Sequence, residues 1–389
     1  MDRHDEFRAH RGGERFGALL GSRPVQGHGH ADHQGEQGSR GGQLGAAGGG
    51  RYKGVAPDAE MAAGKVCDDR GQCQDSAVLA GMEWAATEVD AKVVNMSLGG
   101  TDFPGIDPLE QAVDTLTERT GALFVISARN SGRGTPPGVS SPGSADAALA
   151  VGAVDRSDML AGFSSTGPRV GDHAVKPDLT APGVQITAAA NGTAESPYAV
   201  KSGTSMAAPH VAGAAAILAQ RDPGWGAAQI KAALMNAAEP ASGSSVYQQG
   251  AGRLEVARAV EQTVTTTEAN LSTYLRYPSR DAVKRPVTYH NAGTEPVTLK
   301  LEVNAAENGG GTAPEALFAL SAQTVTVPAG GSAAADITVD PTVHRRTPRP
   351  QPASRDPSLP ASPPSGSQHT GNAADDSVAD GPIPLPWQP

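Results

Sequence analysis

The chain has 389 residues, a formal net charge of −10, 19% charged residues and 38% hydrophobic residues. This length predicts one large domain followed by a smaller one. An acidic chain without a basic cluster in its central part argues against a nucleic-acid partner. No stretch approaches about 18 consecutive apolar residues, which argues against a membrane span. The first nine residues are charged and lack an apolar segment, so they predict no signal peptide.

Residues 1–50 differ in composition from the rest of the chain, because they are rich in Gly, Arg and His. Their apolar residues cluster only at positions 16–20 and around Leu44. We therefore expect an aberrant or disordered N-terminal segment, with residues 1–46 irregular.

A possible metal motif lies inside this segment. Residues 28–33 (HGHADH) fit the His-x-His-x-Asp-His pattern of zinc hydrolases, since imidazole and carboxylate groups both suit zinc. Such a motif needs a preceding apolar strand and further ligands downstream. Residues 23–25 (RPV) and the scattered later histidines do not supply them. We assign no metal ligands here and keep the zinc hydrolase as an alternative.

Between residues 51 and 262 short apolar strands alternate with helices. The expected strands are 92–96, 123–127 and 149–154, and the expected helices are 75–88, 109–116 and 227–237. This alternation predicts an α/β fold, with a parallel sheet covered by helices on both faces. Ligands bind such sheets beyond the carboxyl ends of the strands. Gly99, Gly100 and Asn130 follow two of these strand ends.

Cys67 and Cys73 are the only cysteines of the chain. They could close a short loop as a disulfide in an oxidising compartment, or remain two free thiols. The sequence leaves both states open. A zinc site needs more ligands than this pair supplies.

The segment 203–213 (GTSMAAPHVAG) constrains the chemistry most tightly. The apolar run that begins at Met206 predicts a buried helix with Thr204 or Ser205 at its N-terminus. Pro209 then fits the first helical turn, where proline is tolerated. A hydroxyl at this position faces unpaired backbone N–H groups and the positive end of the helix dipole. These features stabilise an oxyanion that forms beside the hydroxyl.

This segment resembles the serine segment of the subtilisin-like peptidases, and further segments match that family in order. They are residues 54–57 (GVAP), 95–100 (NMSLGG), 130–132 (NSG), 163–168 (FSSTGP) and 176–183 (KPDLTAPG). The resemblance covers residues 51–262. It implies a secreted serine endopeptidase that cleaves polypeptides, acts as a monomer and needs no organic cofactor. The resemblance allows structural calcium, but the sequence identifies no ligands for it.

The same resemblance implies a role for each site residue. Ser205 would be the nucleophile, His28 the general base, Asn130 an oxyanion donor, and Ser97, Leu98 and Gly99 the segment that binds the substrate backbone as an added strand. His28 lies in residues 26–30 (QGHGH), the only trace of the family's histidine motif.

The chain departs from the family pattern at its N-terminus. A subtilisin-like domain opens with an apolar strand that ends in an aspartate, whereas Asp2 and Asp5 lie on polar sequence. From about Gly50 onward the sequence matches the family pattern again. This abrupt change suggests a disrupted reading frame upstream. Without the aspartate we expect little or no proteolytic activity. The alternative is a non-catalytic remnant that binds extended peptides.

Arg129 is the second departure, because it stands where the family pattern has glycine. Glycine at that position lets the backbone approach the side chain of the substrate. An arginine either points away, fills the pocket, or favours an acidic side chain in the substrate.

After residue 262 the pattern becomes all-β. Residues 287–289, 297–303, 325–327 and 337–339 alternate apolar and polar, with turn signals at 291–294 and 328–331. We expect a partial antiparallel β-sandwich at 263–342, similar to a fibronectin-like domain. A disordered Pro-rich tail is expected at 343–389.

Overall fold

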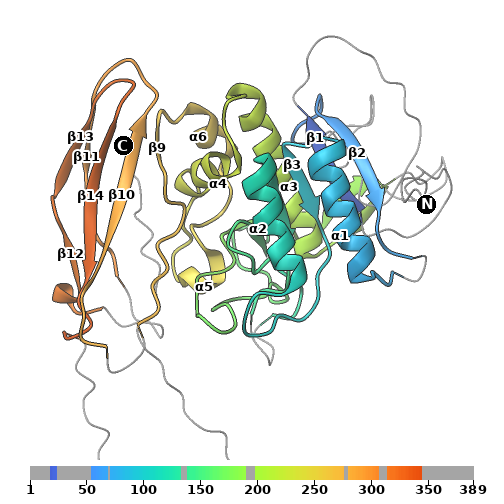
Figure 1. Ribbon diagram of the computed structural model, residues 1–389, viewed down its shortest axis with the longest axis horizontal. Coiled ribbons are helices and arrows are strands. Elements are labelled where there is room, and N and C mark those ends of the chain that lie inside the picture. The colour runs from blue at the N-terminus through green and yellow to red at the C-terminus, as the bar shows by residue number, and fades with distance from the viewer. Residues whose placement is uncertain are drawn as a thin grey trace, which may run out of the picture.

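The computed structural model of the chain describes residues 18–23, 54–68, 71–132, 138–189, 198–275, 279–305 and 313–343. An α/β unit is followed by an all-β unit, and the two lie side by side (Figure 1). The predicted base His28 and the tail from residue 344 lie outside the described residues. No helix in the described part is both long and apolar enough to cross a membrane.

A six-stranded sheet forms the centre of the α/β unit, in the order β2-β1-β3-β4-β5-β6. Its strands are β1 Ala18–Arg23, β2 Glu60–Lys65, β3 Val93–Met96, β4 Leu123–Ser127, β5 Leu149–Val154 and β6 Leu179–Pro182. Strands β3 to β6 pair in parallel. The predicted α/β fold with a parallel sheet is confirmed.

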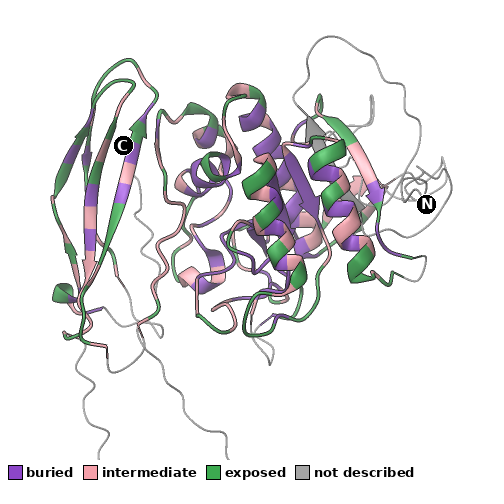
Figure 2. Cartoon of the chain, in the orientation of Figure 1, coloured by how far each residue is buried: buried purple, intermediate pink, exposed green. Residues whose placement is uncertain are grey.

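Alternating side chains of the buried strands pack on opposite faces of the sheet. Val93 and Leu123 belong to one apolar cluster, and their neighbours Val94 and Phe124 belong to another. The first cluster includes residues of α3 (Thr204–Arg221), α4 (Ala227–Asn236) and α6 (Val256–Glu261). The second includes residues of α1 (Asp75–Glu83), the π-helix η2 (Trp84–Glu88) and α2 (Pro108–Thr120). Helices therefore cover both faces, and strands β3, β4 and β5 between them are buried (Figure 2).

Strand β1 comes from the N-terminal segment and runs antiparallel to both of its neighbours. The prediction that residues 1–46 are irregular is therefore wrong for residues 18–23. In the sheet β1 lies between β2 and β3 and supplies the hydrogen-bond partners that their facing edges need. Leu19 pairs with Met96, whereas Arg23 pairs with Glu60. The last residue of β1 thus lies at the edge opposite to the carboxyl ends of β3 to β6, and it is not an aspartate.

The remaining elements of the α/β unit are short. They are a hairpin of β7 (Ile186–Ala189) and β8 (Tyr198–Lys201), and the helix α5 (Val246–Gln249). A disulfide joins Cys67 to Cys73 just after β2. The structure thus selects the disulfide from the two states that the sequence left open.

Two antiparallel sheets pack together in the C-terminal unit. One has the order β12-β14-β10-β9 and the other pairs β11 with β13. Their bounds are β9 Val264–Thr266, β10 Val283–Asn291, β11 Val297–Lys300, the 3₁₀ turn η3 Glu315–Leu317, β12 Phe318–Leu320, β13 Thr324–Val327 and β14 Ser332–Val339. Tyr289 of β10 and Val327 of β13 share one apolar core. The division of the chain at residues 50, 262 and 342 stays a prediction.

Candidate active site

Ser205 lies at the carboxyl-end edge of the sheet, in the first turn of α3. The backbone N–H of Gly203 donates to the carbonyl of Gly183 at 2.8 Å, and Gly183 in turn donates to Val154 at 2.9 Å. Since Val154 ends β5, these two bonds fix the start of α3 at that strand end. Ser205 is half-buried, and its backbone N–H belongs to the helical turn that lacks intrahelical acceptors. This is the position that the sequence predicts for a serine beside a helix N-terminus.

Asn130 is held against the start of α3. Its Oδ1 accepts from the backbone N–H of Thr204 at 2.8 Å and from the Thr204 hydroxyl at 3.0 Å. Two donors on one side-chain oxygen fix the orientation of the amide, so Nδ2 faces the other way. A Cβ on Gly203 would lie 3.3 Å from Nδ2. The structure thus brings Asn130 and Ser205 together.

Ser97 connects the segment after β3 to the residue that carries the candidate nucleophile. Its hydroxyl donates to the backbone carbonyl of Ser205 at 3.1 Å. Pro209 is the sixth residue of α3, so the prediction that it lies in the first turn is wrong. Proline has no N–H, and the Ser205 carbonyl therefore lacks its helical donor. Ser97 supplies that missing hydrogen bond.

Leu98 and Gly99 leave a free backbone edge beside Ser205. Gly100 anchors the segment, because its N–H donates to the Ser141 carbonyl at 2.9 Å. Among the described residues no backbone hydrogen bond engages Leu98 or Gly99. A Cβ on Gly99 would lie 2.6 Å from the Ser141 carbonyl, so only glycine fits there. An unpaired edge of this kind can receive an extended peptide as an added strand.

The Ser205 hydroxyl lies 3.5 Å from the carbonyl oxygen of Ser97. Within the described ranges no hydrogen bond joins it to an imidazole or a carboxylate. His210, on the same helix, bonds the Met206 carbonyl through Nδ1 at 2.8 Å, and burial lowers its pKa. The predicted base, His28, lies outside the described residues. The part of the chain that the structure describes also holds no group of three His, Cys, Asp or Glu side chains suited to a metal.

Arg129 occupies the turn between β4 and Asn130. Its φ of 83° is a left-handed conformation that residues other than glycine rarely adopt. Its side chain is exposed, and Nη1 donates to the Thr101 hydroxyl at 3.3 Å. Because Thr101 follows Gly100 directly, the guanidinium lies beside the predicted substrate-binding segment rather than pointing away from it.

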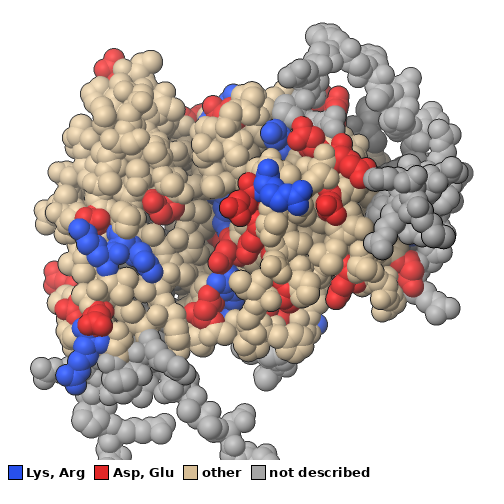
Figure 3. All heavy atoms as spheres, in the orientation of Figure 1, with Lys and Arg blue, Asp and Glu red and all other residues tan. Residues whose placement is uncertain are grey.

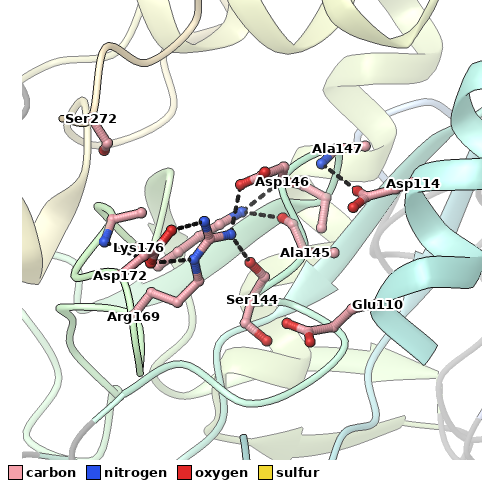
Figure 4. A network of polar contacts seen from close by, with 12 residues as sticks. Glu110, Asp114, Ser144, Ala145, Asp146, Ala147, Arg169, Asp172, Lys176 and Ser272 are labelled. Carbon is pink, nitrogen blue, oxygen red and sulfur yellow. Dashed lines mark hydrogen bonds and ion pairs between the residues drawn. The ribbon is translucent and has the colours of Figure 1, made fainter. Parts of the chain in front are cut away.

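A second polar cluster surrounds Lys176, which is buried, whereas Asp146 and Asp172 at its outer side are exposed (Figure 4). Lys176 and Asp178 form a buried ion pair at 2.8 Å, and Lys231 approaches the other oxygen of Asp178 at 3.2 Å. Burial lowers the pKa of Lys176 to about 8, although Asp178 opposes this shift. Burial alone would raise the pKa of Asp178, but the two ammonium groups outweigh it and hold that pKa below its ordinary value. Arg169 donates to Asp146 and Asp172 in the same region.

A cavity of about 470 Å³ adjoins this cluster. Its cations are matched by carboxylates, because Arg169, Lys176 and Lys231 each contact an aspartate. The balance of charge within the cluster indicates a role in holding β6, α4 and the neighbouring loops together rather than in binding a ligand.

Comparison with known families shows which family the chain belongs to. The model of the subtilase family of peptidases matches residues 26–256, more than half of the chain. The chain belongs to the subtilase family. The resemblance stated from the sequence motifs is thereby confirmed.

Several subtilisins and related proteases resemble about half of the chain. Subtilisin Savinase from Lederbergia lenta is 39% identical over 204 residues, which cover 52% of this chain and 70% of the relative. An alkaline protease from Alkalihalobacillus alcalophilus is also 39% identical, over 52% of this chain and 49% of the relative. Subtilisin E from Bacillus subtilis is 38% identical over 198 residues, or 51% and 48% of the two chains. The chain thus spans about half the length of two of these relatives.

The sequence motifs did not predict two contacts of this subtilase site. Thr204, treated only as a helix start, fixes the Asn130 amide through two hydrogen bonds. Ser97, predicted only to bind substrate, replaces the donor that Pro209 lacks. A proline four residues after the serine was the available signal, because it leaves the serine carbonyl without a helical partner.

Proposed function

We propose that the chain is a serine endopeptidase domain in which the Ser205 hydroxyl attacks a peptide carbonyl. One observation carries this proposal: Ser205 lies in the first turn of α3, beside an Asn130 amide held by Thr204 and beside the free edge of Leu98 and Gly99. Nucleophile, oxyanion donor and substrate edge thus meet within one site.

The chemistry follows from these positions. A peptide paired with Leu98 and Gly99 presents its carbonyl to Ser205, and attack by the hydroxyl oxygen places negative charge on the carbonyl oxygen. The Nδ2 group of Asn130 and the backbone N–H of Ser205 are suited to stabilise that charge. The hydroxyl proton must pass to a base, and we assign that role to His28 on its sequence motif alone.

We further propose that this chain cleaves peptides slowly. Among the described residues no imidazole bonds the Ser205 hydroxyl, and the reversed strand β1 carries no aspartate at its carboxyl end. Serine peptidases that lack a member of the triad accelerate peptide hydrolysis only about 10³–10⁴-fold over the reaction in water. This remaining acceleration comes from substrate binding and from the oxyanion donors. These observations also favour the second candidate function, a non-catalytic module that binds extended peptides.

The test combines a covalent probe with a substrate. Purified chain is treated with a fluorophosphonate and separately incubated with unfolded casein. We expect slow labelling that Ser205→Ala abolishes and that His28→Ala reduces further, together with little casein cleavage. Rapid cleavage would show an intact catalytic base. An absence of labelling at Ser205, with peptide binding retained, would identify the chain as the binding module.

The setting proposed for this activity is extracellular, with polypeptides as partners and the chain acting as a monomer. The Cys67–Cys73 disulfide supports secretion, because such bonds persist in oxidising compartments. The net charge of −10 argues against a nucleic-acid partner. Figure 3 shows acidic and basic side chains interspersed on the visible face.

A further inference from the structure

We propose that Arg129 makes the Ser205 site selective for peptides with an acidic side chain, Asp or Glu, on the residue whose carbonyl faces Ser205. This inference rests on the proposed function, since it assumes that an extended peptide occupies the edge of Leu98 and Gly99. It concerns recognition alone and does not require the catalytic base.

The backbone at Arg129 is fixed relative to the site. Its carbonyl accepts from the N–H of Ser165 at 3.1 Å, and the preceding residue Ala128 donates to Val151 at 2.9 Å. The next residue is Asn130, whose amide is bonded to Thr204. The guanidinium therefore starts from a position held against the start of α3.

The side chain extends toward the space that a peptide would occupy. A carbonyl within reach of both Ser205 and Asn130 lies between the segment after β3 and the segment after β4. Arg129 belongs to the segment after β4, and its hydrogen bond to Thr101 connects it to the segment after β3. A side chain on the residue that carries this carbonyl would approach the guanidinium.

Among the described residues no carboxylate neutralises the Arg129 guanidinium, and the guanidinium has further N–H donors beside the one that contacts Thr101. It is exposed, and no ion pair joins it to a carboxylate in the part of the chain that the structure describes. Asp102 directly follows the Thr101 that Arg129 contacts, but it is only 8% exposed and forms no ion pair with the guanidinium. A planar guanidinium with free N–H groups is well matched to a carboxylate.

The backbone conformation gives independent support. A φ of 83° at a residue other than glycine is unfavourable, and such conformations persist mostly where the surroundings enforce them at functional sites. The contact with Thr101 excludes an arginine that points away. Two roles remain, either selecting an acidic side chain or filling the site.

Two peptides that differ only in charge separate these roles. Fluorescein-labelled Ala-Ala-Pro-Glu amide and Ala-Ala-Pro-Gln amide are titrated with the intact chain, and binding is followed by fluorescence anisotropy at low salt. We expect the Glu peptide to bind about fivefold more tightly. The ratio should fall to about one in Arg129→Gln and shrink in about 0.5 M NaCl. It should persist in Arg285→Gln, which removes an exposed arginine from β10.

Equal binding of the two peptides would overturn the inference, as would binding of neither. A different result would show that the arginine fills the site. The parent chain would then show no preference for Glu, and Arg129→Gly would bind a matching Phe peptide more tightly. The proposed function is judged separately. Preference for Glu without Ser205 labelling would mean that the catalysis fails while the recognition holds.

Discussion

The Ser205 site and the Lys176 cluster both gather polar groups at the sheet, but they use them in opposite ways. The buried ammonium of Lys176 donates to the carbonyls of Ala145 and Ala148 and to Asp178. At the Ser205 site the backbone of Leu98 and Gly99 and the guanidinium of Arg129 retain bonding capacity toward solvent.

This difference distinguishes a cluster that stabilises the fold from a surface that binds a ligand. A polar group buried without a partner costs free energy, so unused donors and acceptors are tolerated only where water or a ligand can reach them. The matched charges of the Lys176 cluster therefore indicate a structural role. The unmatched groups beside Ser205 indicate a binding surface. Substitutions in each cluster should test this contrast through different measurements.

The largest effect is expected for Asp178→Asn, which keeps the side-chain shape but removes the charge between two buried ammonium groups. We expect the free energy of unfolding to fall by about 3–5 kcal/mol, because Lys176 and Lys231 would lose their common counter-charge. Urea denaturation measures this loss. The control Glu239→Gln breaks an exposed ion pair with Arg258 and should cost under about 1 kcal/mol. Equal losses in the two variants would contradict the structural role.

A pH-dependent effect is expected at Asp102, a buried carboxyl that directly follows Thr101. Burial, and then the nearby charge of Glu110, raise its pKa to about 6. The folded state therefore binds the proton more tightly than the unfolded state, whose ordinary pKa is 3.8. The stabilising contribution is full below pH 3.8 and is lost as the pH rises through about 6.

Asp102→Asn removes this dependence. We expect the variant to be more stable than the parent at pH 8 by an amount on the order of 1–3 kcal/mol, and to lose that advantage at low pH. Unfolding midpoints at pH 4 and pH 8 measure the difference. A constant difference between the two pH values would show that Asp102 titrates normally.

The smallest effect is expected at the bond between Ser97 and Ser205. Ser97→Ala leaves the Ser205 carbonyl without a donor and should cost about 1–2 kcal/mol. The same substitution in a Pro209→Ala background should cost much less, because Ala at 209 restores the helical N–H. Denaturation of the four chains of this cycle gives the coupling energy. Identical costs in both backgrounds would show that Ser97 does not replace the helical donor.

Much of the α/β core could be predicted because its signals are local. The strands at 123–127 and 149–154 are short apolar runs, and the structure places β4 and β5 at those residues. The serine segment likewise predicts a buried helix with Thr204 or Ser205 at its N-terminus, and α3 begins at Thr204. By contrast, β1 was missed, because six residues of an otherwise polar segment join the sheet through pairing with β2 and β3.

The sequence by itself determined the family, the α/β class and the identity of the candidate nucleophile, because ordered motifs and apolar periodicity are properties of neighbouring residues. Only the tertiary structure decided that Asn130 bonds Thr204, that Ser97 replaces the donor absent at Pro209, and that Arg129 reaches Thr101. Each of these contacts joins residues at least 28 positions apart in sequence. Hydrogen bonds between such distant residues depend on how the sheet brings its strand ends together, which no local pattern of residues encodes.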